Sequence, residues 1–187
     1  MFGFYGKIPA HGDFIRFRAD VSFVAKWDQF LQEGLGESRE ALNSKWGAAY
    51  QNAPIWRFVL DPDVCGKRAM TGILMPSQDR VGRRFPLTIF HSLPQATSPS
   101  LLDDEPLMTE LENTALACLD AQIDKDELAR RLDAVPFMQA ADTGDANGHS
   151  YWLSTFYAGT ARRDTRRFDG MPKPAQFVEL LTPDRGR

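Results

Sequence analysis

The fold is decided by residues 55–89, which read IWRFVLDPDVCGKRAMTGILMPSQDRVGRRFPLTI. Three segments of this stretch, at 55–60, 69–75 and 85–89, are rich in β-branched, aromatic and other apolar residues. The connections between them contain the prolines, glycines and aspartates that favour tight turns. We therefore predict three strands, joined by two hairpins into an antiparallel meander.

Helical patterns flank this meander. After Asp20, apolar residues recur at helical spacing, and we expect Gly34 and Gly36 to end this helix before a second one at 42–50. Further elements are predicted: a strand at 2–8, helices beginning at Asp103 or Asp104 and at Asp126, a strand at 150–157 and a final helix at 174–181. The helix after Asp104 is expected to bury Leu107, Leu111, Ala115, Cys118 and Leu119.

These elements predict one domain over residues 1–187. A chain of 187 residues, 43% of them hydrophobic, can bury one full core. We expect the α/β (α+β) class, with a mixed, mostly antiparallel sheet of about five strands flanked by helices in three layers. The crossover from the first strand through the helices would allow one parallel pairing.

Composition excludes several classes of protein. The net charge of −3 lacks the basic excess of a general nucleic-acid binder. The first eight residues do not resemble a signal peptide, and the uncharged stretch 85–102 carries three prolines, so we expect no membrane insertion and a cytoplasmic location. Cys65 and Cys118 are far apart, which predicts two reduced thiols and no zinc site. The oligomeric state cannot be predicted.

The densest group of polar and turn residues is Gly6-Lys7-Ile8-Pro9-Ala10-His11-Gly12-Asp13-Phe14, directly after the first predicted strand. Its Gly-Lys pair lacks the glycine spacing and the Ser or Thr of a phosphate-binding loop. His11 and Asp13 could act as an acid–base pair or bind a metal, but such residues two apart in a loop are commonly a turn. We therefore expect no catalytic residue, no metal and no cofactor, and hence no enzyme.

A second polar group occupies the predicted hairpin tip at 79–84. Asp79, Arg80, Arg83 and Arg84 fit either a solvated turn or a rigid fork of guanidinium groups for an acidic or phosphorylated partner. A third cluster, the arginines of 162–167, is diluted by Asp164 and Asp169, and we expect it in a solvated loop.

Both loop motifs resemble those of a known family. The 6–14 motif is similar to the opening GKLPSHGDF pattern of TagF (ImpM) proteins, and MPSQDRVGRRFP at 75–86 is similar to their MPSvDrvGRrFPL segment. Tyr151-Trp152 and Gly170-Met171-Pro172 add matches nearer the end. The resemblance implies a type VI secretion accessory protein, a post-translational negative regulator that is linked to a forkhead-associated scaffold protein. It implies no catalytic residues.

Three hypotheses follow for the two loops. In the first, they bind a protein partner of the secretion apparatus, and the partner-binding residues are Lys7, His11, Asp13, Asp79, Arg80, Arg83 and Arg84. In the second, the His11/Asp13 loop and the Arg80/Arg83/Arg84 hairpin act on or bind a phosphorylated small ligand. In the third, both motifs only fix the fold. Contact through buried carboxylate–arginine bonds would favour the third hypothesis, and an open cleft would favour recognition.

Overall fold

The computed structural model describes residues 1–93, 98–137, 147–157 and 161–183. Seven strands form one sheet in the order β2-β1-β5-β4-β3-β6-β7. Their bounds are β1 Gly3–Gly6, β2 Ile15–Phe17, β3 Trp56–Leu60, β4 Ala69–Met75, β5 Leu87–Leu93, β6 His149–Tyr157 and β7 Ala161–Asp169. The predicted meander is the centre of this sheet, because β3, β4 and β5 are neighbours in it.

Every pairing in the sheet is antiparallel, so the expectation of a mixed sheet of about five strands is wrong in these two details. The α/β class itself is confirmed. The chain turns back after β1 and adds β2 before the first helix begins. β2 has only three residues, which is too short to show a sequence period. β7 carries two pairs of adjacent arginines, Arg162-Arg163 and Arg166-Arg167, in place of the loop that the sequence predicts.

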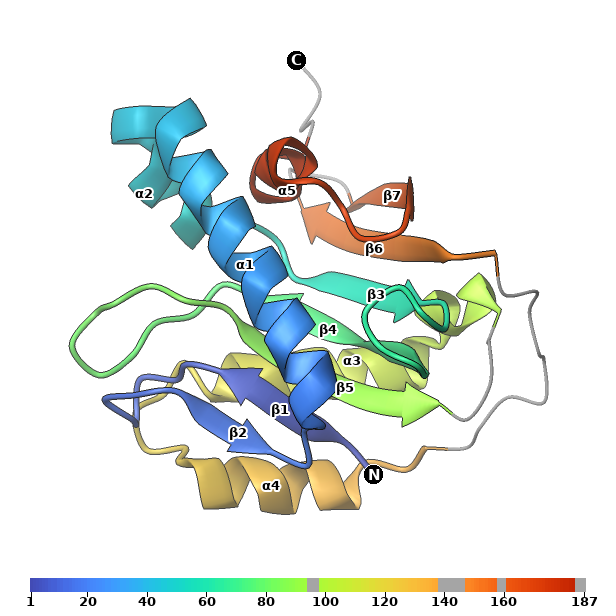
Figure 1. Ribbon diagram of the computed structural model, residues 1–187. Helices are drawn as coiled ribbons and strands as arrows, with labels where there is room; N and C mark the ends of the chain where they lie inside the picture. Colours follow the sequence, from blue (N-terminus) through green and yellow to red (C-terminus); the bar gives the residue numbers. More distant parts are fainter. Residues whose placement is uncertain (94–97, 138–146, 158–160, 184–187) are drawn as a thin grey trace.

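Helices cover both faces of the sheet (Figure 1). On one face lie α1 Val21–Leu42, α2 Trp46–Gln51 and α5 Pro174–Leu181, and on the other lies α3 Glu105–Ala117. Helix α4, Lys125–Ala134, packs beside α3 and below β2. Short 3-10 turns occupy Asn43–Lys45 and Pro99–Asp103. The N-caps of α1, α3 and α4 are Asp20, Asp104 and Asp124, whose side chains accept amide hydrogen bonds.

Two hydrophobic cores result, one on each face. The core under α1 and α5 is aromatic and includes Trp27, Phe58 and Trp152. The core under α3 and α4 is mostly aliphatic and includes Ile73, Leu111 and Leu128. The three-layer arrangement is therefore as expected from the amphipathic helices.

Helix α1 does not end at Gly34 or Gly36, contrary to expectation, but continues to Leu42. Gly34 is buried where α1 crosses α5: a Cβ atom there would lie 2.4 Å from Cγ of Phe177. Glycine at 34 thus permits close packing of two helices. Leu119 also differs from its expected burial, with 48% exposure, because α3 ends at Ala117.

No helix among the described residues combines the length and the apolar character that crossing a bilayer requires.

Candidate functional site: an edge formed by two loops

The two polar loops lie against each other at one end of the sheet. Because β1 pairs with β5, the loop that leaves β1 and the loop that enters β5 meet at the same end. The Arg80 amide donates a hydrogen bond of 2.8 Å to the carbonyl of His11. Nη2 of Arg83 donates to the carbonyl of Gly12, which is 71 residues away in sequence. We call this joint surface of residues 7–14 and 77–85 the loop edge.

A buried ion pair joins the loops beneath this surface. Nζ of Lys7 lies 3.0 Å from Oδ2 of Asp79, and the two residues are only 7% and 1% exposed. Nε of Arg83 donates to the same oxygen at 2.6 Å. Oδ1 of Asp79 accepts from the amides of Val81 and Arg83, at 3.1 and 2.9 Å. Each carboxylate oxygen thus has two donors, so the buried charge is compensated.

These donors determine the protonation of Asp79. Burial by itself raises the pKa of this carboxyl group, because the charged form loses its hydration. Hydrogen bonds from the Arg83 amide, the Lys7 ammonium, the Arg83 guanidinium and the Val81 amide outweigh burial and hold the pKa of Asp79 well below its usual value. Asp79 is therefore ionised at neutral pH.

Neighbouring elements hold the loop edge in place. The Tyr50 hydroxyl of α2 donates to the Ser77 carbonyl at 2.8 Å and accepts from the Ser77 amide at 3.1 Å. Nε2 of His11 accepts from the amide of Lys125, the first residue of α4, at 3.3 Å. Gly82 has φ +85°, which other residues rarely adopt, and this permits the tight turn at the hairpin tip.

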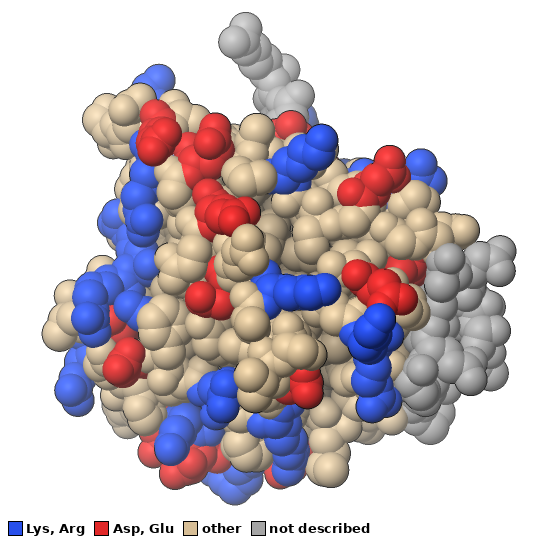
Figure 2. Space-filling view, viewed as in Figure 1, with Lys and Arg blue, Asp and Glu red and all other residues tan. Residues whose placement is uncertain are grey.

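The outer face of the loop edge combines charge with exposed apolar side chains. Phe14 is 41% exposed and Val81 71% exposed, while Asp13 and Arg80 are also exposed. Figure 2 shows basic side chains along the edge of the molecule where Figure 1 places the 76–86 hairpin. Phe14 and Val81 therefore give this charged face two apolar side chains that a partner could bury.

The structure places the seven predicted partner-binding residues in different environments. Lys7 and Asp79 are interior and hold the two loops together, so they do not contribute to the outer face. His11 is half-buried against the start of α4. The remaining four residues reach the surface: Asp13, Arg80, Arg83 and Arg84.

Sequence reasoning missed Phe14 and Val81. Each stands within a polar motif, and an isolated apolar residue in a motif gives no periodic signal. For Val81, its position directly before Gly82 at the predicted hairpin tip could have indicated exposure, whereas Phe14 has no such signal.

The geometry offers little to acid–base chemistry. Among the described residues, no hydrogen bond joins His11 to Asp13: His11 contacts Lys125, and Oδ1 of Asp13 accepts from the amide of Phe14. In the same part of the chain, no three His, Cys, Asp or Glu side chains lie close enough together to hold a metal ion.

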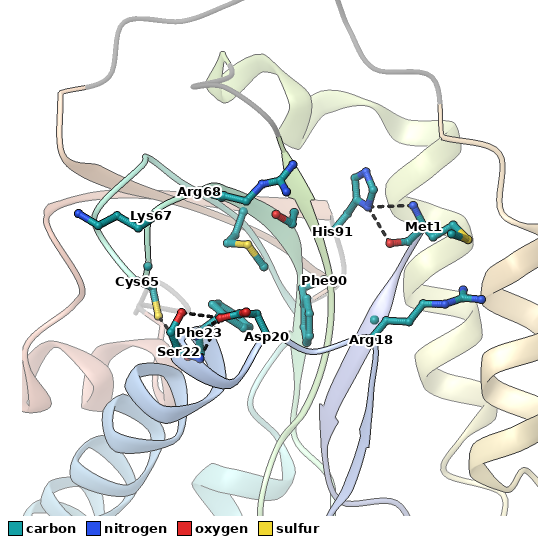
Figure 3. Close-up of a pocket in the computed structure, with 14 residues that line it drawn as sticks. Met1, Arg18, Asp20, Ser22, Phe23, Cys65, Lys67, Arg68, Phe90 and His91 are labelled. Carbon is teal, nitrogen blue, oxygen red and sulfur yellow. Dashed lines mark hydrogen bonds between the residues drawn. The ribbon is translucent and has the colours of Figure 1, made fainter.

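A cavity of about 470 Å³ lies at the end of the sheet opposite the loop edge (Figure 3). Its charged side chains already have partners. Asp20 caps α1, Arg18 pairs with Asp133, and Nε of Arg68 donates to the Leu93 carbonyl at 3.3 Å. Burial lowers the pKa of His91, which contacts Met1. We assign this cavity no ligand.

The arginine cluster at 162–167, expected in a loop, lies on the edge strand β7 instead. Arg163 forms an ion pair with Asp103. Arg166 contacts both Asp164, at 2.9 Å, and Glu179. The pairs with Asp103 and Glu179 connect the strand to the 3-10 turn at Pro99–Asp103 and to α5. Charged side chains on an edge strand also oppose pairing with other chains.

The structure therefore defines a three-layer α/β protein in which two polar loops, joined by a buried ion pair, form one edge of an antiparallel sheet. The chain belongs to the type VI secretion system-associated family described as the TagF N-terminal domain, whose model matches residues 3–135. This match includes both loops and confirms the resemblance. The protein is thus type VI secretion-associated.

A solved structure is similar over the whole chain. The PA0076 protein of Pseudomonas aeruginosa PAO1 matches with a TM-score of 0.86 and 28% sequence identity, over 100% of this chain and 96% of that one. The similarity extends past residue 135 and includes β6, β7 and α5. No curated protein matches the sequence significantly.

Proposed function

We propose that this protein regulates type VI secretion negatively, in the cytoplasm, by binding a protein partner through the loop edge. The partner class that the TagF resemblance implies is a forkhead-associated scaffold protein. One observation carries the proposal: the buried contacts of Asp79 with Lys7 and Arg83 fix two distant loops as one rigid surface. A rigid surface binds with less loss of conformational entropy than a mobile one.

The chemistry of the outer face supports contact with a macromolecule. Val81 projects from a hairpin tip whose turn is fixed by hydrogen bonds, and the exposed Arg80 stands beside it. Arginine is enriched in interface hot spots, where few residues provide most of the affinity, and Val81 adds apolar area beside it. The structural role of Lys7 and Asp79 agrees with this proposal, because recognition requires that these side chains be positioned.

The proposal is tested with the double variant Arg80→Glu/Val81→Asp. Both side chains point outward, so the melting temperature should stay within about 2 °C of the parent value, as is usual for surface substitutions. Affinity for the purified forkhead-associated protein of the same secretion system, measured by calorimetry, should fall at least tenfold, about 1.4 kcal/mol. In cells that overproduce the variant, secretion should be repressed less than by the parent.

Lys67→Glu provides the matched control. Lys67 is exposed in the loop between β3 and β4, at the other end of the sheet. Its substitution replaces a positive charge with a negative one, as Arg80→Glu does. Its affinity should equal that of the parent. If the double variant binds the scaffold protein as tightly as the control does, the loop edge is not the contact surface.

A further inference from the structure

A second cavity lies beside the loop edge, between the 76–86 hairpin, the loop after β1 and helix α2. Its volume is about 250 Å³, enough for one or two amino-acid side chains. Pro9, Pro76 and Leu119 provide apolar walls, and Gln51, Gln78 and Arg84 provide polar ones. We call it the Arg84 pocket.

The guanidinium of Arg84 is held in a fixed position. It lies 5.4 Å from the ring centroid of Trp46, a cation–π contact. Gly47 permits this placement, because a Cβ atom there would lie 3.0 Å from Nη1 of Arg84. A half-buried arginine fixed in this way loses little side-chain entropy when it binds an anion.

Arg84 differs from its neighbour Arg83 in its charge environment. Within the described ranges, no carboxylate forms an ion pair with Arg84, and none lines the pocket. This differs from Arg83, the next residue on the same hairpin, whose guanidinium is bonded to Asp79. The pocket therefore has an unused, oriented cation.

Neutral polar side chains line the same pocket. The side-chain amides of Gln51 and Gln78 form no hydrogen bond within the described part of the chain. Ser77, which is 5% exposed, also lines the pocket, and its Oγ is a buried polar atom without a hydrogen-bond partner. Buried hydroxyls are usually paired, and the described residues leave this one without a partner.

We propose that the Arg84 pocket binds one carboxylate side chain, Asp or Glu, of an extended acidic segment in a protein partner. The inference rests on the proposed function and specifies the chemistry of its partner. A single cation with neutral donors fits a singly charged carboxylate, which a guanidinium binds bidentately. A phosphate carries nearly two charges, and only one cation lines the pocket. An aliphatic neighbour of the acidic residue packs on Pro9 and Leu119.

The test uses capped tripeptides, so it does not depend on the scaffold protein. The full chain, labelled with ¹⁵N, is titrated with acetylated and amidated leucine–glutamate–leucine while the Arg84 Nε–H and Gln78 amide signals are followed by NMR. We expect saturable shifts with a dissociation constant in the millimolar range, roughly what one charged contact supports. The leucine–glutamine–leucine peptide should bind about tenfold more weakly or not at all.

Two variants separate the pocket from general surface charge. Gln78→Glu places a carboxylate opposite Arg84, its cross-strand partner, on an exposed position that should not disturb folding. Binding should fall about 10- to 100-fold in this variant and in Arg84→Gln. Lys67→Gln, which removes an exposed cation at the other end of the sheet, should bind the peptide as the parent does.

Several results would overturn the proposal. These are equal shifts with the glutamate and glutamine peptides, binding that survives Gln78→Glu, equal loss in Lys67→Gln, or tighter binding of inorganic phosphate than of the glutamate peptide. If the peptide binds at Arg84 and the scaffold protein does not bind the loop edge, the pocket stands and the proposed function fails. If the scaffold protein binds the loop edge and the peptide does not bind at Arg84, the proposed function is kept and the pocket is rejected.

Discussion

At the scale of single residues, Asp79 lies under the loop edge and receives hydrogen bonds from Lys7, Val81 and Arg83. It was predicted as a contact residue, but its side chain is interior. A motif can therefore combine residues that hold a surface together with residues that form it. Charged residues with either role look alike in a sequence, because both are polar residues in a turn.

Replacing Asp79 with Asn should destabilise the protein at neutral pH, because a neutral amide leaves Lys7 as a buried cation without a counter-ion. The pKa of Asp79 is lowered in the folded state, so its ionisation stabilises the fold above the unfolded-state pKa of about 3.9. That contribution is lost as the pH falls through the lower, folded-state pKa. The difference in melting temperature between parent and variant should therefore be constant at pH 5–7 and shrink below about pH 4.

Circular dichroism melts across this pH range provide the measurement. The control is Asp13→Asn, which changes an exposed carboxylate of the same loop edge and should alter the melting temperature little at any pH. A difference for Asp79→Asn that stays constant down to pH 2 would contradict the assigned ionisation.

At the scale of secondary structure elements, the two glycines of α1 have different environments. Both were expected to end the helix, because glycine has a low helix propensity. The helix continues because its apolar face is buried on the sheet and on α5, and tertiary packing outweighs the local preference. A Cβ atom at position 34 would meet Phe177, whereas at position 36 it would meet nothing within 4 Å.

This contrast gives a paired prediction. Gly34→Ala should destabilise the protein by about 1–3 kcal/mol, because overpacking against the Phe177 ring outweighs the gain in helix propensity. Gly36→Ala should stabilise it by about 0.5–1 kcal/mol through that same propensity. Urea unfolding followed by tryptophan fluorescence measures both values. A stabilising Gly34→Ala would show that α1 and α5 pack less tightly than described here.

At the scale of the whole molecule, the sheet separates two cores that each contain one cysteine. Cys65 lies in the aromatic core and Cys118 in the aliphatic core. Burial raises the pKa of the Cys65 thiol to about 12 and that of Cys118 to about 11. Both are therefore protonated and inaccessible in the folded protein, so they should react with a thiol reagent only after the core opens.

The two thiols thus report whether the layers unfold together, as the expectation of one domain over 1–187 requires. The variants Cys65→Ala and Cys118→Ala each keep one thiol, whose rate of reaction with an aromatic disulfide reagent gives the free energy of opening of the core around it. After correction for the stability of each variant, we expect the two opening free energies to be equal. The control reaction, in denaturant, should be fast for both thiols. Faster opening at Cys118 alone would show that the α3 and α4 layer unfolds separately.

The sequence by itself determined the class of fold, the central meander, the start of one helix after Asp20 and of another near Asp104, and the family motifs of the two loops, because periodicity, turn residues and motifs are local properties. The tertiary structure alone decided the strand order, the antiparallel pairing of β1 with β5 and the continuation of α1 through Gly34. It also decided that Lys7 and Asp79 are interior, while among the described residues no carboxylate pairs with Arg84. These features depend on contacts between residues far apart in the chain, such as Lys7 with Asp79, and no local pattern records which distant side chain will neutralise a charge.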